Sequence, residues 1–186
     1  SVEDDPLCRV IKSLKDTVIF VVAAGNDGPD PWVIGSPGAS PHAVTVGAWS
    51  SHYNGLAAFS SRGPNGRWYA SRGGTGHQDF AIYGQDMVKP DVVAPGGGPV
   101  QEGDPMDLLY SGVVGWMDGA YDLTPLDGWG PMRGTSMATP LAAGVITLAV
   151  EHGLVATARD VKQKMARFGG KDPGRGYGMI TYKKLR

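Results

Sequence analysis

The chain has 186 residues, of which 41% are hydrophobic, and its 17 basic and 18 acidic residues give a net charge of −1. This length suits one domain with a sizeable core, and the composition excludes a disordered protein. Because the charges are balanced and spread along the chain, nucleic acids and anionic membrane surfaces are disfavoured as partners, and no apolar run is long enough to span a membrane.

The first part of the chain predicts a helix and then a buried strand. Asp5 followed by Pro6 is typical of a helix start, and apolar residues continue at helical spacing to about Lys15. Residues 17–24 form a continuous β-branched and apolar run, which suits a central strand buried on both faces of a parallel sheet. The run ends in a turn at residues 25–29. Ligands bind beyond the carboxyl ends of strands in open α/β sheets, so we expect the chemistry at this turn.

The middle of the chain predicts two more short strands separated by loops. The strands are expected at residues 43–48 and 91–94, each closed by small or turn-forming residues. Residues 62–88 are polar and rich in glycine, which indicates a surface loop with a further strand around residues 80–83. A second loop is predicted from residue 96 to residue 133.

The last third of the chain predicts two helices. From Ser136 to Val150 the residues are apolar on nearly every face of a helix that is too short to cross a bilayer, so it belongs in a protein interior. Gly153 is a suitable stop for this helix. Thr157 and Asp160 form an N-terminal cap for the helix that follows.

Ser136 has an unusual position for a serine, at the start of an apolar helix. Its backbone N–H is among the first unpaired donors, and the helix dipole places partial positive charge there, so an anion developing at Ser136 would be stabilised. Pro140 agrees with this placement, because a missing N–H in the first turn costs no hydrogen bond. The alternative is that Ser136 only caps the helix, although Thr135 can serve as the cap instead.

Several motifs follow one another along the chain. They are AAGN at residues 23–26, SPG at 36–38 with AVTVGA at 43–48, FSSRGP at 59–64, KPDVVAPG at 89–96 and GTSMATP at 134–140. In this order they resemble the subtilisin family of serine peptidases, from about residue 5 to residue 185. The resemblance implies an α/β fold, the three-layer subtilisin-like fold with a mostly parallel sheet. Residues 1–186 would form the C-terminal part of the peptidase catalytic domain, completed by a missing N-terminal half.

The resemblance implies that Ser136 is the catalytic nucleophile. A hydroxyl attacks well only when a base takes its proton, and the tetrahedral oxyanion that results needs preorganised donors. The Ser136 N–H would be one donor, and the side-chain amide of Asn26 would be the second. Taken alone, Asn26 would more simply suit a left-handed turn before Asp27 and Gly28. The ordered motifs favour the catalytic role.

The Asp and His of the catalytic triad are not found in the family's context. The histidines are His42, His52, His77 and His152, and none lies in a His-Gly-Thr-like string, so each is expected to be structural. The Asp and His are therefore expected on a separate N-terminal chain or segment, as in a processed subunit or a nicked protease. That partner would also supply the first strands of the sheet. This half alone would have an exposed sheet edge and an exposed apolar face.

The resemblance also implies a substrate pocket. Its wall would be the backbone of Ala23, Ala24 and Gly25, and its floor would lie near Gly35, where no side chain fills the space. A roomy pocket of this kind would accept large apolar or aromatic side chains. Asp27 at the rim could attract basic groups, or it could be only a solvated turn residue.

The loop of residues 97–133 carries acidic residues that could provide oxygen ligands for a structural calcium ion, which many subtilisin-like enzymes bind. They are Glu102, Asp104, Asp107, Asp118, Asp122 and Asp127. No calcium-loop spacing is present, so a surface loop is the favoured interpretation. The chemistry itself is expected to require no cofactor and no metal.

The leading hypothesis is a serine endopeptidase that hydrolyses peptide or protein substrates through an acyl-enzyme on Ser136. The alternative is a non-catalytic pseudoprotease or partner subunit that keeps the fold for binding, which the presence of both Ser136 and Asn26 disfavours. A third hypothesis is that this half alone is active with one of its own histidines. The family resemblance favours an extracellular or secreted protein.

Overall fold

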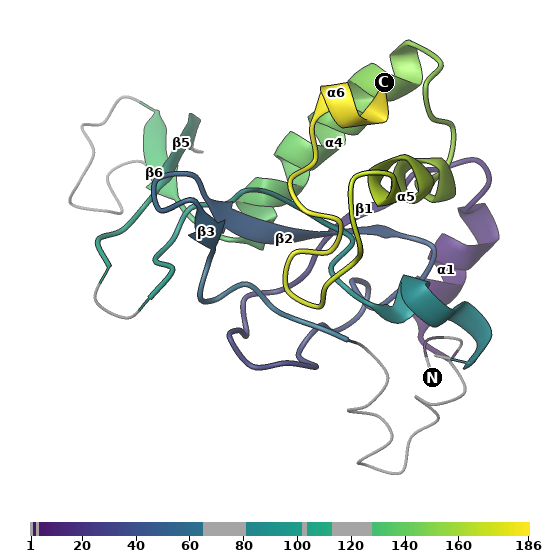
Figure 1. Cartoon of the computed structure of the whole chain (residues 1–186), viewed down its shortest axis with the longest axis horizontal. Coiled ribbons are helices and arrows are strands. Elements are labelled where there is room, and N and C mark those ends of the chain that lie inside the picture. The colour runs from purple at the N-terminus through teal and green to yellow at the C-terminus, as the bar shows by residue number, and fades with distance from the viewer. Residues whose placement is uncertain (1, 3, 65–80, 102–103, 113–127) are drawn as a thin grey trace.

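A sheet with β2 at its centre organises the structure (Figure 1). The computed structural model describes residues 2, 4–64, 81–101, 104–112 and 128–186. In chain order its elements are α1 (Pro6–Leu14), β1 (Val21–Ala23), β2 (Val44–Ser50), β3 (Gly55–Leu56), the 3-10 helix η1 (Gly84–Met87), β4 (Val92–Pro95), β5 (Leu109–Gly112), β6 (Trp129–Met132), α4 (Thr135–Glu151), α5 (Ala158–Ala166) and α6 (Tyr182–Leu185).

The central sheet is mostly parallel, as predicted. Strand β2 pairs in parallel with β1, with Val21 opposite Val44, and with β4, with Val46 opposite Val92. The short strand β3 pairs antiparallel with the end of β2. Almost every residue of β2 is buried, which agrees with its β-branched and apolar sequence. The order of helices and parallel strands confirms the predicted α/β class.

Strand β1 differs from the prediction of a strand buried on both faces. Only Val21–Ala23 are paired, all three are partly exposed, and the preceding Val18 is 41% exposed. Among the described strands, β1 pairs with β2 alone. Burial of both faces requires neighbours that the described residues do not provide, so β1 is an edge strand.

Helix α4 covers one face of the sheet, together with α5 and α6 (Figure 1). Small and apolar residues on one side of α4 are fully buried against β2 and β4; they are Ala138, Ala142, Ile146 and Ala149. The opposite side of the helix is open, since Leu141, Leu148 and Val150 are each close to half exposed. The prediction that α4 is wholly interior is therefore wrong for this side.

The helix boundaries agree with their sequence signals. Asp5 is the N-cap of α1 and accepts a hydrogen bond from the Cys8 N–H at 2.9 Å. Thr157 and Asp160 form the predicted capping box of α5, in which each side chain accepts from the other's backbone N–H. Helix α4 ends just before Gly153, which has a φ of 66°. Each of these helix ends is determined by residues that are close to it in the sequence.

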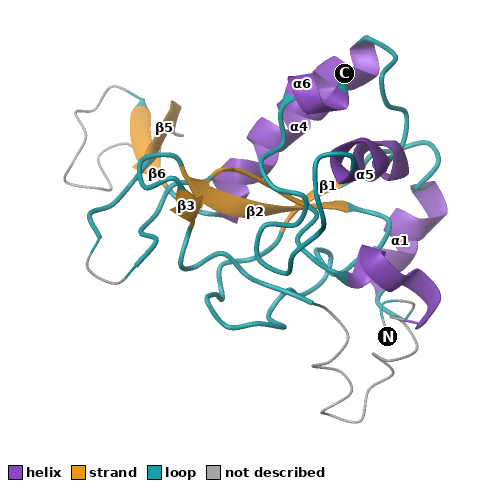
Figure 2. Ribbon diagram, viewed as in Figure 1, coloured by secondary structure: helices purple, strands orange, loops and turns teal. Residues whose placement is uncertain are grey.

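Two loop predictions are wrong. Residues 81–83 are helical and lead into η1, so there is no strand there, and Phe80 lies outside the described residues. The loop of residues 96–133 contains β5 and β6, which pair antiparallel with Leu109 opposite Met132. Figure 2 shows these two strands apart from the central sheet. Their pairing joins segments about twenty residues apart, which residue type alone does not reveal.

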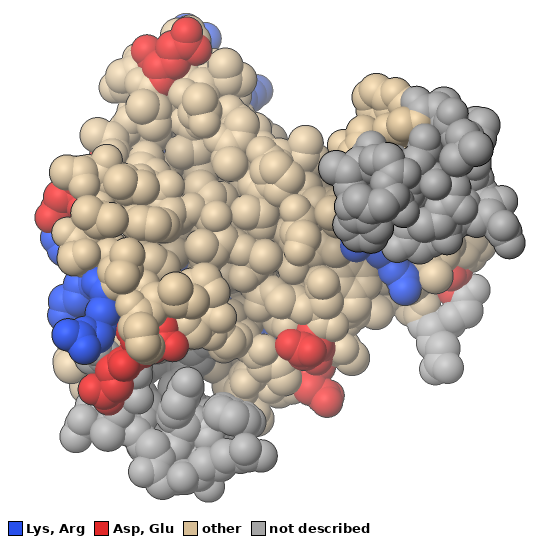
Figure 3. All heavy atoms as spheres, turned by 180° about the vertical axis from the view of Figure 1, so that it is seen from behind, with Lys and Arg blue, Asp and Glu red and all other residues tan. Residues whose placement is uncertain are grey.

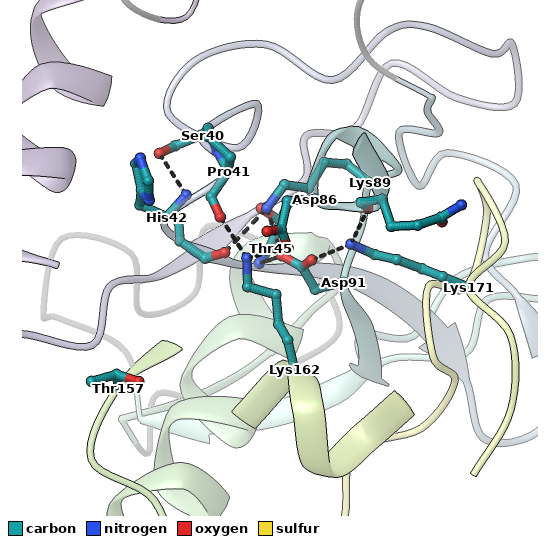
Figure 4. A network of polar contacts seen from close by, with 12 residues as sticks. Ser40, Pro41, His42, Thr45, Asp86, Lys89, Asp91, Thr157, Lys162 and Lys171 are labelled. Carbon is teal, nitrogen blue, oxygen red and sulfur yellow. Dashed lines mark hydrogen bonds and ion pairs between the residues drawn. The ribbon is translucent and has the colours of Figure 1, made fainter. Parts of the chain in front are cut away.

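A buried ionic network fastens the sheet to the C-terminal part of the chain (Figure 4). Asp91, directly before β4, is fully buried, and its Oδ2 accepts from Lys89 Nζ at 2.6 Å and from the Thr45 N–H at 2.8 Å. Its Oδ1 accepts from Lys171 Nζ, also at 2.6 Å. Lys162 on α5 donates to the Pro41 carbonyl. The network thus joins β2, β4, α5 and the segment before α6.

The charges in this network depend on one another. Burial alone would raise the pKa of Asp91, but the cations of Lys89 and Lys171 lower it well below its ordinary value. Burial lowers the pKa of Lys89 to about 7, although the charge of Asp91 opposes this change. Among the described residues, Asp91 is therefore the anion that pairs with both Lys89 and Lys171.

Replacing Asp91 by Asn should destabilise the protein by about 3–5 kcal/mol, because Lys89 and Lys171 would lose the counter-charge that offsets their burial. Asp86→Asn is the matched control, since Asp86 pairs with Lys162 but its side chain is 49% exposed. We expect that control to cost less than about 1 kcal/mol. Urea denaturation of the full-length protein measures both losses, and equal losses would contradict the role given to Asp91.

The contribution of Asp91 to stability should also depend on pH. The folded-state pKa of Asp91 lies below its ordinary value of 3.8, so the network stabilises fully above that value and loses its effect as the pH falls through the folded-state pKa. The difference in unfolding free energy between the wild type and Asp91→Asn should therefore shrink from about pH 4 to about pH 2. A difference that stays constant over this range would show that Asp91 does not titrate in this way.

Candidate active site

Ser136 lies in the first turn of α4 and is exposed to solvent. Gly134 is the N-cap, and its carbonyl accepts from the N–H groups of Met137 at 3.0 Å and Ala138 at 3.3 Å. The Thr135 N–H is bound to Asn26. Within the described part of the chain, the Ser136 N–H is left without a hydrogen-bond partner at the positive end of the helix dipole. It is available to bind an anion.

Pro140 lies in the second turn of α4 and not in the first turn as predicted. Because α4 begins at Thr135, Pro140 is the sixth helical residue and lies beyond the first turn. A proline at this position removes the N–H that would bind the Ser136 carbonyl. The helix nevertheless continues to Glu151, and Pro140 lies on its exposed side.

The side chain of Asn26 is held beside the start of α4. Its Oδ1 accepts from both the N–H and the hydroxyl of Thr135, each at 3.0 Å, across 109 residues of sequence. Because a backbone N–H can only donate, the amide oxygen must face Thr135, and the amide nitrogen is the atom left to donate elsewhere. A Cβ placed on Gly134 would lie 3.5 Å from that nitrogen. The structure thus brings the Asn26 amide and the Ser136 segment together.

Thr135 is a further residue of this candidate site, which the sequence did not identify. It is buried, and it is the first helical residue and so does not cap the helix as expected. Its hydroxyl donates to Asn26 Oδ1 and accepts from the Gly25 N–H at 3.3 Å. Thr135 therefore orients the amide of Asn26. In the sequence, only the position of Thr135 next to Ser136 pointed to a role at the site. A short stretch of sequence cannot reveal a hydrogen-bond partner such as Asn26, which is 109 residues away.

Ser61 holds the backbone of the expected pocket wall, at residues 25–27, through two hydrogen bonds. The Gly25 carbonyl accepts from the Ser61 N–H at 3.0 Å, and the Asp27 N–H donates to Ser61 Oγ at the same distance. Gly25 has a φ of 103°, and a Cβ there would lie 2.8 Å from Ser61 Oγ, so both conformation and space require glycine. Ala24 is buried at the end of β1, whereas Asp27 is exposed.

The expected pocket floor is open. Gly35 is exposed, and no heavy atom lies within 4 Å of the position that its Cβ would take. A Cβ on Gly38 would lie 3.0 Å from the Ala23 carbonyl oxygen and 3.2 Å from that of Gly35. The backbones of Ala23 and Gly35 therefore both lie next to Gly38. A pocket with its wall at Ala23 and its floor at Gly35 requires the two to be this close.

The described histidines make contacts away from Ser136. His42 meets the Tyr83 ring edge-on at 5.4 Å, and His52 meets Tyr53 at 4.6 Å. His152 caps the end of α4, where its Nδ1 lies 2.8 Å from the Leu148 carbonyl oxygen. His77 is outside the described residues. In the described ranges, no histidine is hydrogen-bonded to the Ser136 hydroxyl.

The loop carboxylates that the structure describes accept hydrogen bonds from the protein itself. Asp104 accepts from the N–H groups of Val100 and Gln101, and Asp107 accepts from the Ser50 hydroxyl at 2.8 Å. Within the described chain, no group of three or more His, Cys, Asp or Glu side chains could hold a metal ion. The other predicted ligands, Glu102, Asp118, Asp122 and Asp127, lie outside the described residues.

Comparison with known proteins identifies the family. The family model described as the subtilase family matches residues 5–174. The chain belongs to the subtilase family. Serine protease AprX of Bacillus subtilis is 34% identical over 168 residues, which cover 87% of this chain and 32% of AprX. Pyrolysin of Pyrococcus furiosus is 33% identical over 159 residues, covering 72% of this chain and 9% of pyrolysin.

Two solved protease structures share the fold of this chain. A lanthipeptide protease superposes with a TM-score of 0.66 at 19% identity, over 96% of this chain and 53% of that protein. A psychrophilic protease gives a TM-score of 0.57 at 26% identity, over 94% and 52% respectively. The α/β subtilisin-like fold is thus confirmed. This subtilase chain spans about a third of AprX and about half of either solved structure.

Among the helices of this subtilase that the structure describes, none combines the length and the apolar character needed to cross a bilayer.

Thr135→Val should lower kcat for peptide hydrolysis by about 10-fold to 100-fold and leave KM nearly unchanged, because misplacing a catalytic group by about 1 Å can cost about 100-fold. The variant removes the hydroxyl that holds Asn26 and Gly25 but keeps the side-chain shape. Thr147→Val is the control, since it makes the same change on the exposed side of α4. Equal kinetics for the two variants would argue against a positioning role for Thr135.

Proposed function

We propose that this chain carries the nucleophile and the oxyanion donors of a serine endopeptidase. The observation that supports this most directly is the fixed Asn26 amide beside the helix start that presents Ser136. Both residues are exposed, so a substrate can reach them. Membership of the subtilase family supports the same chemistry.

In the proposed mechanism Ser136 Oγ attacks the carbonyl carbon of the scissile peptide bond. A base takes the hydroxyl proton, and the oxyanion that forms accepts hydrogen bonds from the Ser136 N–H and from Asn26 Nδ2. The intermediate collapses to an acyl-enzyme, and the leaving amine receives the proton. Water then hydrolyses the ester and restores Ser136. These steps require no cofactor.

The base and its carboxylate are proposed to come from an N-terminal segment or chain outside these residues. In the described residues no histidine is hydrogen-bonded to Ser136, and the chain spans only 32% of AprX. Strand β1 has one paired edge, and the outer side of α4 exposes Leu141 and Leu148. Seen from behind, a broad area of the surface carries no charged side chain (Figure 3). Such an open edge and apolar face suit docking of the remaining part of a catalytic domain.

The substrates are proposed to be peptides or proteins with a large apolar or aromatic residue before the scissile bond. The open space at Gly35 and the glycine at position 25 support a roomy pocket. Asp27 is exposed at the rim, where its carboxylate would favour basic groups. Secretion is proposed on the basis of the family membership.

A fluorophosphonate probe applied to the full-length protein should label Ser136, and Ser136→Ala should lose both labelling and peptide hydrolysis. Ser13→Ala is the control, because Ser13 is an exposed serine on α1 that only bonds to the Val10 carbonyl. Asn26→Ala should lower kcat by about 10²–10³, which is the loss known for an oxyanion donor of subtilisin itself. Unchanged hydrolysis in Ser136→Ala would refute the proposal. Folded protein that never labels would favour the non-catalytic binding subunit.

A further inference from the structure

A cavity of about 500 Å³ lies beside the segment that follows Asn26. It contains neither Asn26 nor Ser136. Its lining residues are Pro29, Pro31, Leu56, Arg62, Gly63, Val100, Asp172, Pro173, Gly174 and Arg175. The size is typical of sites for small ligands, which are mostly apolar with a few polar groups.

Arg62 is the unusual member of this lining. Its Nε is buried, and in the described part of the chain it has no hydrogen-bond partner. Arg62 as a whole is partly exposed, but buried polar atoms such as its Nε are nearly always hydrogen-bonded. The guanidinium is also preorganised to bind a carboxylate through two parallel hydrogen bonds. An anion in the cavity would supply the partner that Arg62 lacks.

The other charges of the cavity are already paired. Asp172 Oδ2 accepts from Arg175 Nε at 3.0 Å, and its Oδ1 accepts from the N–H groups of Gly174 and Arg175. Burial alone would raise the pKa of Asp172, but these hydrogen bonds together lower it by more. The pKa therefore lies below its ordinary value, and Asp172 is ionised at neutral pH. Two cations and one anion leave the cavity with a net charge of +1. The remaining walls are apolar and are formed by Pro29, Pro31, Leu56 and Val100.

The cavity is joined to the oxyanion turn by backbone hydrogen bonds. The Gly28 N–H donates to the Phe59 carbonyl at 2.8 Å, and the Val33 N–H donates to the Arg62 carbonyl at 3.1 Å. The same segment holds Asp27 through Ser61 Oγ. The cavity therefore adjoins the turn that carries Asn26, although neither Asn26 nor Ser136 lines it.

We propose that this cavity binds a carboxylate borne next to an apolar side chain, as at the end of a short peptide, with Arg62 as its anchor. The apolar walls take the side chain, and the carboxylate neutralises the surplus positive charge. This site does not depend on the peptidase activity, because it uses none of the catalytic groups.

Calorimetric titration of the full-length Ser136→Ala protein tests the site without turnover. The probe is acetyl-Leu-Leu with a free carboxylate, and its amide is the neutral control. We expect the acid to bind at least about tenfold more tightly than the amide, which is the usual value of a charge-assisted hydrogen bond. Adding Arg62→Gln should remove this preference, whereas Arg9→Gln on the exposed side of α1 should not.

Three results would overturn the proposal: equal affinity for acid and amide, a preference that survives Arg62→Gln, or no saturable binding at millimolar concentration. Arg62→Gln removes a buried Nε that has no hydrogen-bond partner in the described residues, so its melting temperature should not fall below that of the parent protein. If the variant fails to fold, the comparison of acid and amide on the parent protein still decides. Because the readout is binding, failure here leaves the peptidase proposal untouched.

Discussion

The site depends on the pair of hydrogen bonds that Thr135 donates to Asn26 Oδ1. They join the end of β1 to the start of α4, so the direction of the Asn26 amide is set by how the helix lies on the sheet. That position is set in turn by small residues, since Ala138 and Ala142 are fully buried against β2 and β4. Close packing resists displacement because any gap loses contacts. Core packing and site geometry are therefore one constraint in this protein.

The Asp91 network holds the other end of the same sheet. A buried ion pair is weak evidence for net stability, but it is strongly selective, because each partner left alone is costly. Here one carboxylate requires Lys89 before β4 and Lys171 from a segment 80 residues away. Lys162 adds α5 to the same place. The network thus specifies how the C-terminal segments pack, while the apolar core supplies most of the stabilisation.

The sequence predicted well the features that local chemistry decides. The caps at Asp5 and Thr157, the strand at β2 and the position of Ser136 at a helix start are all confirmed. It failed where distant contacts decide. The hydroxyl of Thr135 is used by Asn26 and not by the helix, and β1 is half exposed although its composition suits a buried strand. No pattern within a short window contains these partners.

Strand β1 lacks the devices that natural edge strands use against unwanted pairing. Val21, Val22 and Ala23 carry no charge, proline or bulge on the open edge. Any polypeptide that displays such a strand offers its unpaired backbone to the next molecule as readily as to its proper neighbour. Pairing of this kind between two copies is bimolecular, so its rate grows with concentration. Within the described residues, the open edge of β1 is therefore a place where the chain can self-associate.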